Sequence, residues 1–174
     1  KEWESQDYHH ALTELNLDIQ QNPDKIDAYY RRSELCYELE DYQTGIKDLD
    51  AILQRDSGEA LAYMFRGYGY GQLKNYSQAI SDYSAAIELC PNYAKAYFNR
   101  GTIYNRLEQY PNAIADFDRA IMLDREYLDA YYNRGIANNK LKQYRQAIAD
   151  YSQVIRLDPE DREAYYNRAN TYNK

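Results

Sequence analysis

The sequence predicts an all-α protein built from repeated pairs of helices. Three observations predict this class: a period of 34 residues along the chain, apolar residues that recur twice per period at helical spacing, and polar or proline residues where the helices should end. A chain of 174 residues with 44% apolar content is long enough to bury a continuous core.

The repeat becomes visible when one residue in each copy is set as position 1, namely Ile26, Ala60, Ala94, Leu128 and Arg162. Position 4 is then tyrosine in every copy: Tyr29, Tyr63, Tyr97, Tyr131 and Tyr165. Position 17 is also tyrosine, at Tyr8, Tyr42, Tyr76, Tyr110 and Tyr144. Position 20 is always small, at Ala11, Gly45, Ala79, Ala113 and Ala147. We therefore predict four complete units, 26–59, 60–93, 94–127 and 128–161, between a partial unit 1–25 with only a second helix and the first helix of a further unit at 162–174, all in one solenoid domain.

Each unit is expected to hold two helices. Apolar residues at positions 3, 4, 8 and 11 follow helical spacing, and those at positions 20, 21, 24, 27 and 28 do so again. Polar pairs such as 40–41 separate the two helices, Pro111 fits a first helical turn, and proline at position 32 closes the second helix in three copies. The pattern predicts ten helices, the first beginning near Ser5 and the last ending at Tyr172.

This combination of repeat length, helix pair and small, aromatic and proline positions resembles the tetratricopeptide repeat family over nearly the whole chain. The resemblance implies a right-handed superhelical α-solenoid of antiparallel helix pairs, with the first helix of each unit lining a concave groove. It also implies a protein-interaction scaffold and not an enzyme. Because Tyr165, Ala169 and Tyr172 would face a second helix in a complete unit, we expect the array to be a piece of a longer solenoid.

A charged pair recurs between the two helices of each unit. Arginine stands at position 7 and aspartate at position 23, as Arg32 with Asp48, Arg66 with Asp82, Arg100 with Asp116, and Arg134 with Asp150. Because a scaffold needs the same contact in every unit, we predict a structural ion pair within each one.

Composition excludes several functional classes. The net charge of −7 argues against general nucleic-acid binding, and no stretch is apolar enough to span a membrane. The compartment is left open, with a cytoplasmic location as the default. His9 and His10 are adjacent on a helix and point in different directions, which is a poor arrangement for two ligands of one metal ion. Cys36 and Cys90 are expected to be reduced. The glycines at 67, 69 and 71 lie in a helical pattern, where they predict a soft point or a close backbone approach, and we expect no cofactor.

The resemblance turns positions 2, 5, 6, 9, 12 and 13 of the first helix toward the groove. The candidate partner-binding residues are Met64, Phe65, Tyr68, Phe98, Asn99, Arg106, Tyr132, Asn133, Lys140, Tyr166 and Asn167. Asn99, Asn133 and Asn167 share position 6 and resemble the asparagine ladder with which some family members grip a peptide backbone, although asparagine is also common there in the family generally. Residues 64, 65 and 68 are either an exposed apolar patch or a packing contact.

Three hypotheses for function follow. The leading one is a module that holds an extended peptide or partner protein in the groove; residues 1–59, with 6 basic and 15 acidic side chains, favour a basic partner segment there. The second is an assembly scaffold that acts through its ends and convex face, with self-association of the exposed ends. The third is the regulatory region of a larger enzyme. The lysine, asparagine and arginine positions with which some family members clamp the carboxyl terminus of heat-shock chaperones are not filled in this way here.

Overall fold

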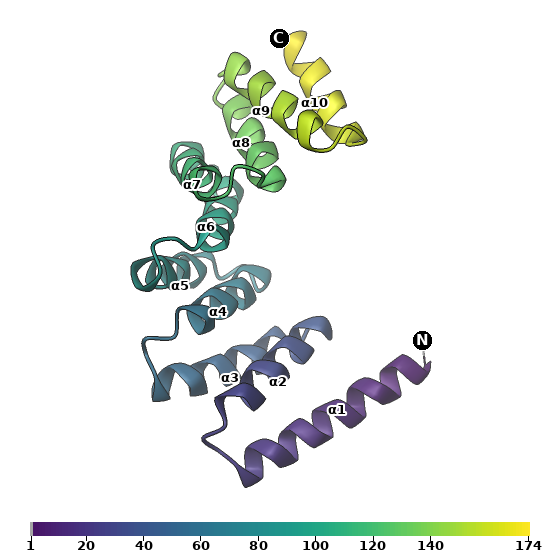
Figure 1. The fold of residues 1–174 in the computed structure, drawn as a ribbon, viewed down its shortest axis with the longest axis vertical. Helices are drawn as coiled ribbons and strands as arrows, with labels where there is room; N and C mark the ends of the chain where they lie inside the picture. The colour runs from purple at the N-terminus through teal and green to yellow at the C-terminus, as the bar shows by residue number, and fades with distance from the viewer. Residues whose placement is uncertain (1) are drawn as a thin grey trace. The chain divides into compact units, whose positions relative to one another are not determined.

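The computed structural model describes residues 2–174, with the side chains of residues 8–174. The described residues form ten helices and no strand (Figure 1). The helices are α1 (Glu2–Gln21), α2 (Ile26–Glu38), α3 (Tyr42–Arg55), α4 (Ala60–Gln72), α5 (Tyr76–Leu89), α6 (Ala94–Arg106), α7 (Tyr110–Leu123), α8 (Leu128–Lys140), α9 (Tyr144–Leu157) and α10 (Arg162–Tyr172). The all-α class that the sequence predicts is therefore confirmed.

The chain divides into two compact units, Lys1–Leu89 with α1 to α5 and Cys90–Lys174 with α6 to α10. Within the first unit, α2 packs on α3, α3 on α4, and α4 on α5. Within the second, α6 packs on α7, α7 on α8, α8 on α9, and α9 on α10. Within each of these two compact units, successive helices thus pack on one another, which is how a solenoid builds a core from local contacts.

Helix ends follow the sequence pattern with one difference. The last helix ends at Tyr172, as predicted, and Pro111 lies in the first turn of α7. The first helix begins at Glu2, earlier than the predicted start near Ser5. Later second helices are preceded by a tight turn from the first helix of the same unit, whereas the segment before Tyr8 has no such turn, so the helix runs on toward the N-terminus.

A recurring turn joins the two helices of each complete 34-residue repeat. Position 15 has a left-handed backbone in all four complete repeats, with φ of 60° at Glu40, 61° at Lys74, 58° at Glu108 and 60° at Lys142. In the repeat 26–59 the amide of Glu40 donates to the carbonyl of Tyr37, and the amide of Asp41 donates to the carbonyl of Cys36. This pair of bonds is a Schellman motif, which satisfies carbonyls left over at the helix end. The motif normally uses glycine, so each of these side chains tolerates strain.

Small residues let the helices approach closely. Alanine at position 3 of each first helix is almost fully buried, at Ala28, Ala62, Ala96, Ala130 and Ala164. Alanine at position 20 is also fully buried, at Ala79, Ala113 and Ala147. Glycine at position 8 lies against the ring at position 24, as Gly101 does against Phe117 and Gly135 against Tyr151. At Gly67, where the sequence predicts a soft point or a close backbone approach, the Tyr83 ring packs in the same way.

The predicted ion pair between positions 7 and 23 is confirmed in all four complete repeats. The shortest distances between guanidinium nitrogens and carboxylate oxygens are 2.5–2.8 Å, and the aspartate side chains are 3–7% exposed. Each arginine also lies over the position 4 tyrosine of its own helix, as Arg134 does over Tyr131 with 5.5 Å to the ring centroid. The pair therefore holds the two helices of a unit together from inside the protein.

The same arginines form a second link that the sequence analysis missed. Arg66 also bonds Asp50, and Arg134 also bonds Asp118, both through Nη1. These aspartates lie at position 25 of the preceding second helix, so one guanidinium joins two successive repeats. Position 25 escaped notice because its residue type changes along the chain; the corresponding partner of Arg32 is Asn16.

Candidate functional site

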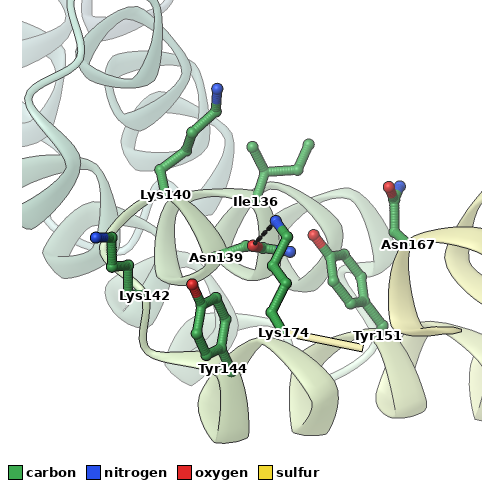
Figure 2. Close-up of a pocket in the computed structure, with 8 residues that line it drawn as sticks. All are labelled: Ile136, Asn139, Lys140, Lys142, Tyr144, Tyr151, Asn167 and Lys174. Atoms are coloured by element: carbon green, nitrogen blue, oxygen red, sulfur yellow. Dashed lines mark hydrogen bonds between the residues drawn. The ribbon is translucent and has the colours of Figure 1, made fainter. Parts of the chain in front are cut away.

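A hollow lined in part by predicted groove residues lies in the second unit, between α8, α9 and α10 (Figure 2). Its volume is about 380 Å³. The lining residues are Ile136, Asn139, Lys140, Lys142, Tyr144, Tyr151, Asn167 and Lys174. Two of the predicted partner-binding residues, Lys140 and Asn167, are brought together here. Lys142 in the turn after α8, and Tyr144 and Tyr151 of α9, were not among the predicted partner-binding residues.

The floor of this hollow is fixed by hydrogen bonds around Asn139. Its Nδ2 donates to Oγ1 of Thr171 at 2.6 Å, and its Oδ1 accepts from Nζ of Lys174 at 2.9 Å, the bond drawn in Figure 2. The Lys174 ammonium also lies 5.9 Å from the ring centroid of Tyr144. These contacts hold Asn139 in one orientation, so it serves the packing of α8 on α10.

A second network orients Asn167 beside the hollow. Its Nδ2 donates to the hydroxyl of Tyr132 at 2.8 Å, and this hydroxyl donates to Glu163 at 3.0 Å. Burial, followed by the hydrogen bond to Glu163, raises the pKa of Tyr132 to about 12. The Tyr132 ring packs on Tyr151 with centroids 6.0 Å apart. Tyr132 is thus a bridge between repeats, with Asn167 held at its tip.

The asparagines at position 6 are all half-buried. In Asn133 the Nδ2 group donates to the carbonyl of Asp129 in its own helix at 2.8 Å. The backbone carbonyl of Asn133 accepts from Asn105 at 3.2 Å. Position 12 was expected to face the groove, but here it reaches the next first helix and joins two repeats. A role of Asn99, Asn133 and Asn167 toward a ligand stays a prediction.

Several aromatic candidates are occupied in packing. Phe98 lies against Phe117 and Tyr127, with centroid distances of 5.9 and 4.9 Å. Phe65 is half-buried and 6.4 Å from the ring of Tyr30. Phe98 thus packs within its own repeat, and Phe65 fills space between the first helices α2 and α4. The sequence could not separate this role from a groove contact, because both need a large apolar residue.

The candidate residues of α4 were expected to form either an exposed apolar patch or a packing contact. Met64 is only 4% exposed, so it offers no surface to a ligand, whereas Tyr68 is 40% exposed. Tyr68 packs on Tyr37 and Tyr42, with centroid distances of 5.8 and 6.5 Å. Among the remaining candidates, Arg106 and Lys140 are exposed and Tyr166 is 68% exposed.

Another hollow in the second unit surrounds the Arg134 ion pairs and has a volume of about 360 Å³. Its charged lining residues are Asp118, Arg134 and Asp150. Burial raises the pKa of Asp150, against the opposing effect of the Arg134 guanidinium. Because these groups satisfy one another, this hollow is part of the scaffold.

No group of three or more histidine, cysteine, aspartate or glutamate side chains in residues 8–174 is placed to hold a metal ion. Among the described helices, none is both long and apolar enough to cross a membrane.

Comparisons with known proteins agree with the fold. Residues 94–127 and 128–161 match the tetratricopeptide repeat family, and residues 67–107 match a further TPR repeat family. None of the curated proteins compared with the chain matches it. The first TPR of Spaghetti (RPAP3), solved with the HSP90 peptide SRMEEVD, is 30% identical, with a TM-score of 0.65, and the match covers 68% of this chain and 94% of that chain.

Two other solved structures show the likeness over more of the chain. MamA is 18% identical with a TM-score of 0.84, covering 94% of this chain and 95% of its own. YrrB, described as a TPR protein with an unusual peptide-binding site, is 23% identical with a TM-score of 0.78, covering 91% of this chain and 82% of its own. At these identities the likeness shows the fold alone.

The chain belongs to the tetratricopeptide repeat family and has its all-α solenoid fold. Proteins of this fold are generally non-catalytic, and the family supports a protein-interaction scaffold with a protein or peptide partner for this chain.

Proposed function

We propose that the chain binds an extended segment of a partner protein along its first helices, with asparagines at position 6 bonding the backbone of the segment. The observation that carries this proposal is the pair Asn133 and Asn167. They lie half-buried at the same position of successive first helices in one unit. No described group donates a hydrogen bond to either carboxamide oxygen, so both oxygens are open to a partner.

The chemistry of the carboxamide fits an extended backbone. A peptide in extended form presents amide donors and carbonyl acceptors along its length, and an asparagine side chain offers one acceptor group and one donor group. Asn167 is already oriented by the Tyr132 hydroxyl, so little side-chain freedom is lost on binding. Contacts of this type bind many sequences, and the neighbouring side chains select among them.

Side chains for selection are present in both units. In the second unit Arg106, Lys140 and Tyr166 are exposed beside Asn99, Asn133 and Asn167. In the first unit Tyr68 offers an exposed ring with half-buried Phe65 next to it, and Glu34 and Glu38 on α2 are exposed. The two glutamates support a basic stretch of the partner at the first unit.

The test is co-purification of partners from the source cell with the wild-type chain and with the double variant Asn133→Ala/Asn167→Ala. Asn92→Ala/Asn112→Ala is the matched control, because both of these asparagines are exposed and lie outside the first helices. We expect a partner that is lost only with the first variant, while the circular dichroism spectrum shows that both variants remain folded. An identical set of partners for all three chains would contradict the proposal.

A second candidate function is self-association through α10. Tyr165, Tyr166 and Tyr172 are 45%, 68% and 67% exposed, which is an apolar surface of the kind that mediates protein contacts. A molar mass that rises with concentration, and falls back in Tyr166→Ser/Tyr172→Ser, would support it. A constant monomer mass would exclude it.

A further inference from the structure

We infer that the hollow between α8, α9 and α10 holds an aspartate or glutamate side chain of the bound segment, with Lys140 and Lys142 as its partners. This inference rests on the proposed function and adds a chemical preference to it. The preferred partner segment at the second unit is acidic, and the carboxylate that binds belongs to a side chain within the segment.

The charge of the lining supports an anion. Three of the eight lining residues are lysines and none is acidic. Among the described side chains, no carboxylate lies within ion-pair distance of Lys140 or Lys142, whereas Lys25 in the first unit is paired with Asp18 at 2.6 Å. Two unpaired ammonium groups at one hollow raise the local positive potential, although the chain as a whole is acidic with a net charge of −7.

The three lysines differ in how they are placed. Figure 2 shows Lys174 reaching across the hollow to Asn139, whereas Lys140 and Lys142 project from the rim. Lys174 is therefore already engaged, and the two rim lysines are the ones with free donors. Lys142 follows Lys140 by two residues, in the left-handed turn after α8, where its φ is 60°.

The preceding repeat shows that Lys140 has left an internal acceptor unused. Lys140 occupies the position in α8 that Lys174 occupies one repeat later, and Asn105 corresponds in the same way to Asn139. Lys174 bonds Oδ1 of Asn139, yet Oδ1 of Asn105 is buried with no hydrogen-bond partner. The Lys140 ammonium thus stands free of its own scaffold, and exposed Arg106 lies at the same position in α6.

The walls of the hollow strengthen a charge pair formed inside it. Ile136, Tyr144 and Tyr151 line it together with Asn167. Their apolar surface reduces the water around a bound carboxylate, so its attraction to the ammonium groups is less screened than on a flat surface. The Asn167 carboxamide lies at the same hollow, so one segment could contact it through its backbone and the lysines through its side chain.

The experiment selects binders from a random library of short peptides with acetylated and amidated ends, so that no terminal carboxylate is present. The bait is the whole chain as wild type, as Lys140→Gln/Lys142→Gln, or as the control Lys47→Gln/Lys74→Gln. Lys47 and Lys74 are exposed lysines of the first unit, and Lys74 has the same turn position and φ of 61° as Lys142. Both double variants therefore lose the same charge.

We expect aspartate or glutamate to be enriched at one peptide position with the wild type and the control, and not with Lys140→Gln/Lys142→Gln, which still selects peptides. Replacing that acidic residue by its amide should weaken binding to wild type about tenfold, as for a charged pair that is partly shielded from water. The amide peptide should bind wild type and the Lys140→Gln/Lys142→Gln variant equally.

Two results would overturn the inference. Peptides selected by wild type without acidic enrichment, or with enrichment that survives in Lys140→Gln/Lys142→Gln, would show that these lysines select nothing while leaving peptide binding intact. Failure of every bait to select any peptide would instead contradict the proposed function, and the inference would fall with it.

Discussion

The ring of Tyr37 in α2 occupies the space that a side chain on Gly45 in α3 would need. The same side chain reaches α4, where its hydroxyl donates to the carbonyl of Phe65 at 3.1 Å and lies against Gly69. Position 20 is alanine in the three later units, and position 12 there is Gly71, Asn105 or Asn139 in place of tyrosine. The large ring at one position thus accounts for the glycine at the other.

The Tyr37–Gly45 contact predicts a sign reversal for one substitution. In wild type, Gly45→Ala should lower the free energy of unfolding by about 1–3 kcal/mol, because the added methyl group overlaps the Tyr37 ring. In a Tyr37→Asn background the same change should raise it by about 1 kcal/mol, since alanine then fits and favours the helix. Urea denaturation of the four chains measures both values, and equal effects in the two backgrounds would refute the coupling.

The two aspartates that bond Arg134 should differ in their contribution to stability. Asp150 is 4% exposed and Asp118 is 56% exposed in their side chains. Asp150→Asn should cost about 3 kcal/mol because it leaves a half-buried guanidinium without its buried charged partner. Asp118→Asn should cost less than about 1 kcal/mol, as exposed pairs do. Denaturant unfolding compares them directly, and similar losses would show that burial does not set the strength of this network.

The strained turn at Glu108 predicts a stabilising substitution. Its φ of 58° is costly for a side chain and natural for glycine, so Glu108→Gly should raise the free energy of unfolding by about 1 kcal/mol. The control Ala149→Gly places glycine at an exposed position inside α9 and should lower stability by about 1 kcal/mol. A loss of stability in both variants would mean that the turn gains more from the glutamate side chain than it loses in strain.

Tyr132 predicts a dependence of stability on alkaline pH. Its pKa is raised to about 12 in the folded chain, so the unfolded chain loses this proton first, and the stabilisation is present below about pH 10 and lost as the pH rises toward the folded value. Tyr132→Phe lacks the bonds to Glu163 and Asn167 and should melt at a lower temperature than wild type at neutral pH. This deficit should shrink as the pH approaches about 11. A deficit that stays constant over that range would show that the hydroxyl does not titrate differently in the two states.

The strict period made much of the fold predictable from the sequence. The ion pair between positions 7 and 23, such as Arg100 with Asp116, could be predicted from this one sequence. A charged pair that recurs in every repeat is expected to serve the structure. The link from Arg134 to Asp118 was missed because position 25 varies in type. Tyr37 was missed for a related reason, since its reach to α4 occurs in one unit only.

The site was less predictable because one helix face serves two purposes. Positions 5 and 12 were taken as groove positions, yet Phe98 packs on Phe117 of its own repeat and Asn105 bonds the next repeat. Helical spacing gives the direction of a side chain but not the distance to the next helix, which decides whether it meets protein or solvent. Lys142 was not predicted as a site residue because it lies in a turn, outside any helical face.

The central claim is that a partner segment lies along the first helices of the second unit, and amide chemical-shift mapping tests it most directly. The measurement titrates a selected peptide into the isotope-labelled chain and follows each backbone amide. We predict that the largest shifts fall on α6, α8 and α10, around Asn133, Lys140 and Asn167. Shifts confined to the outer faces of α7 and α9, with those three residues unchanged, would contradict it.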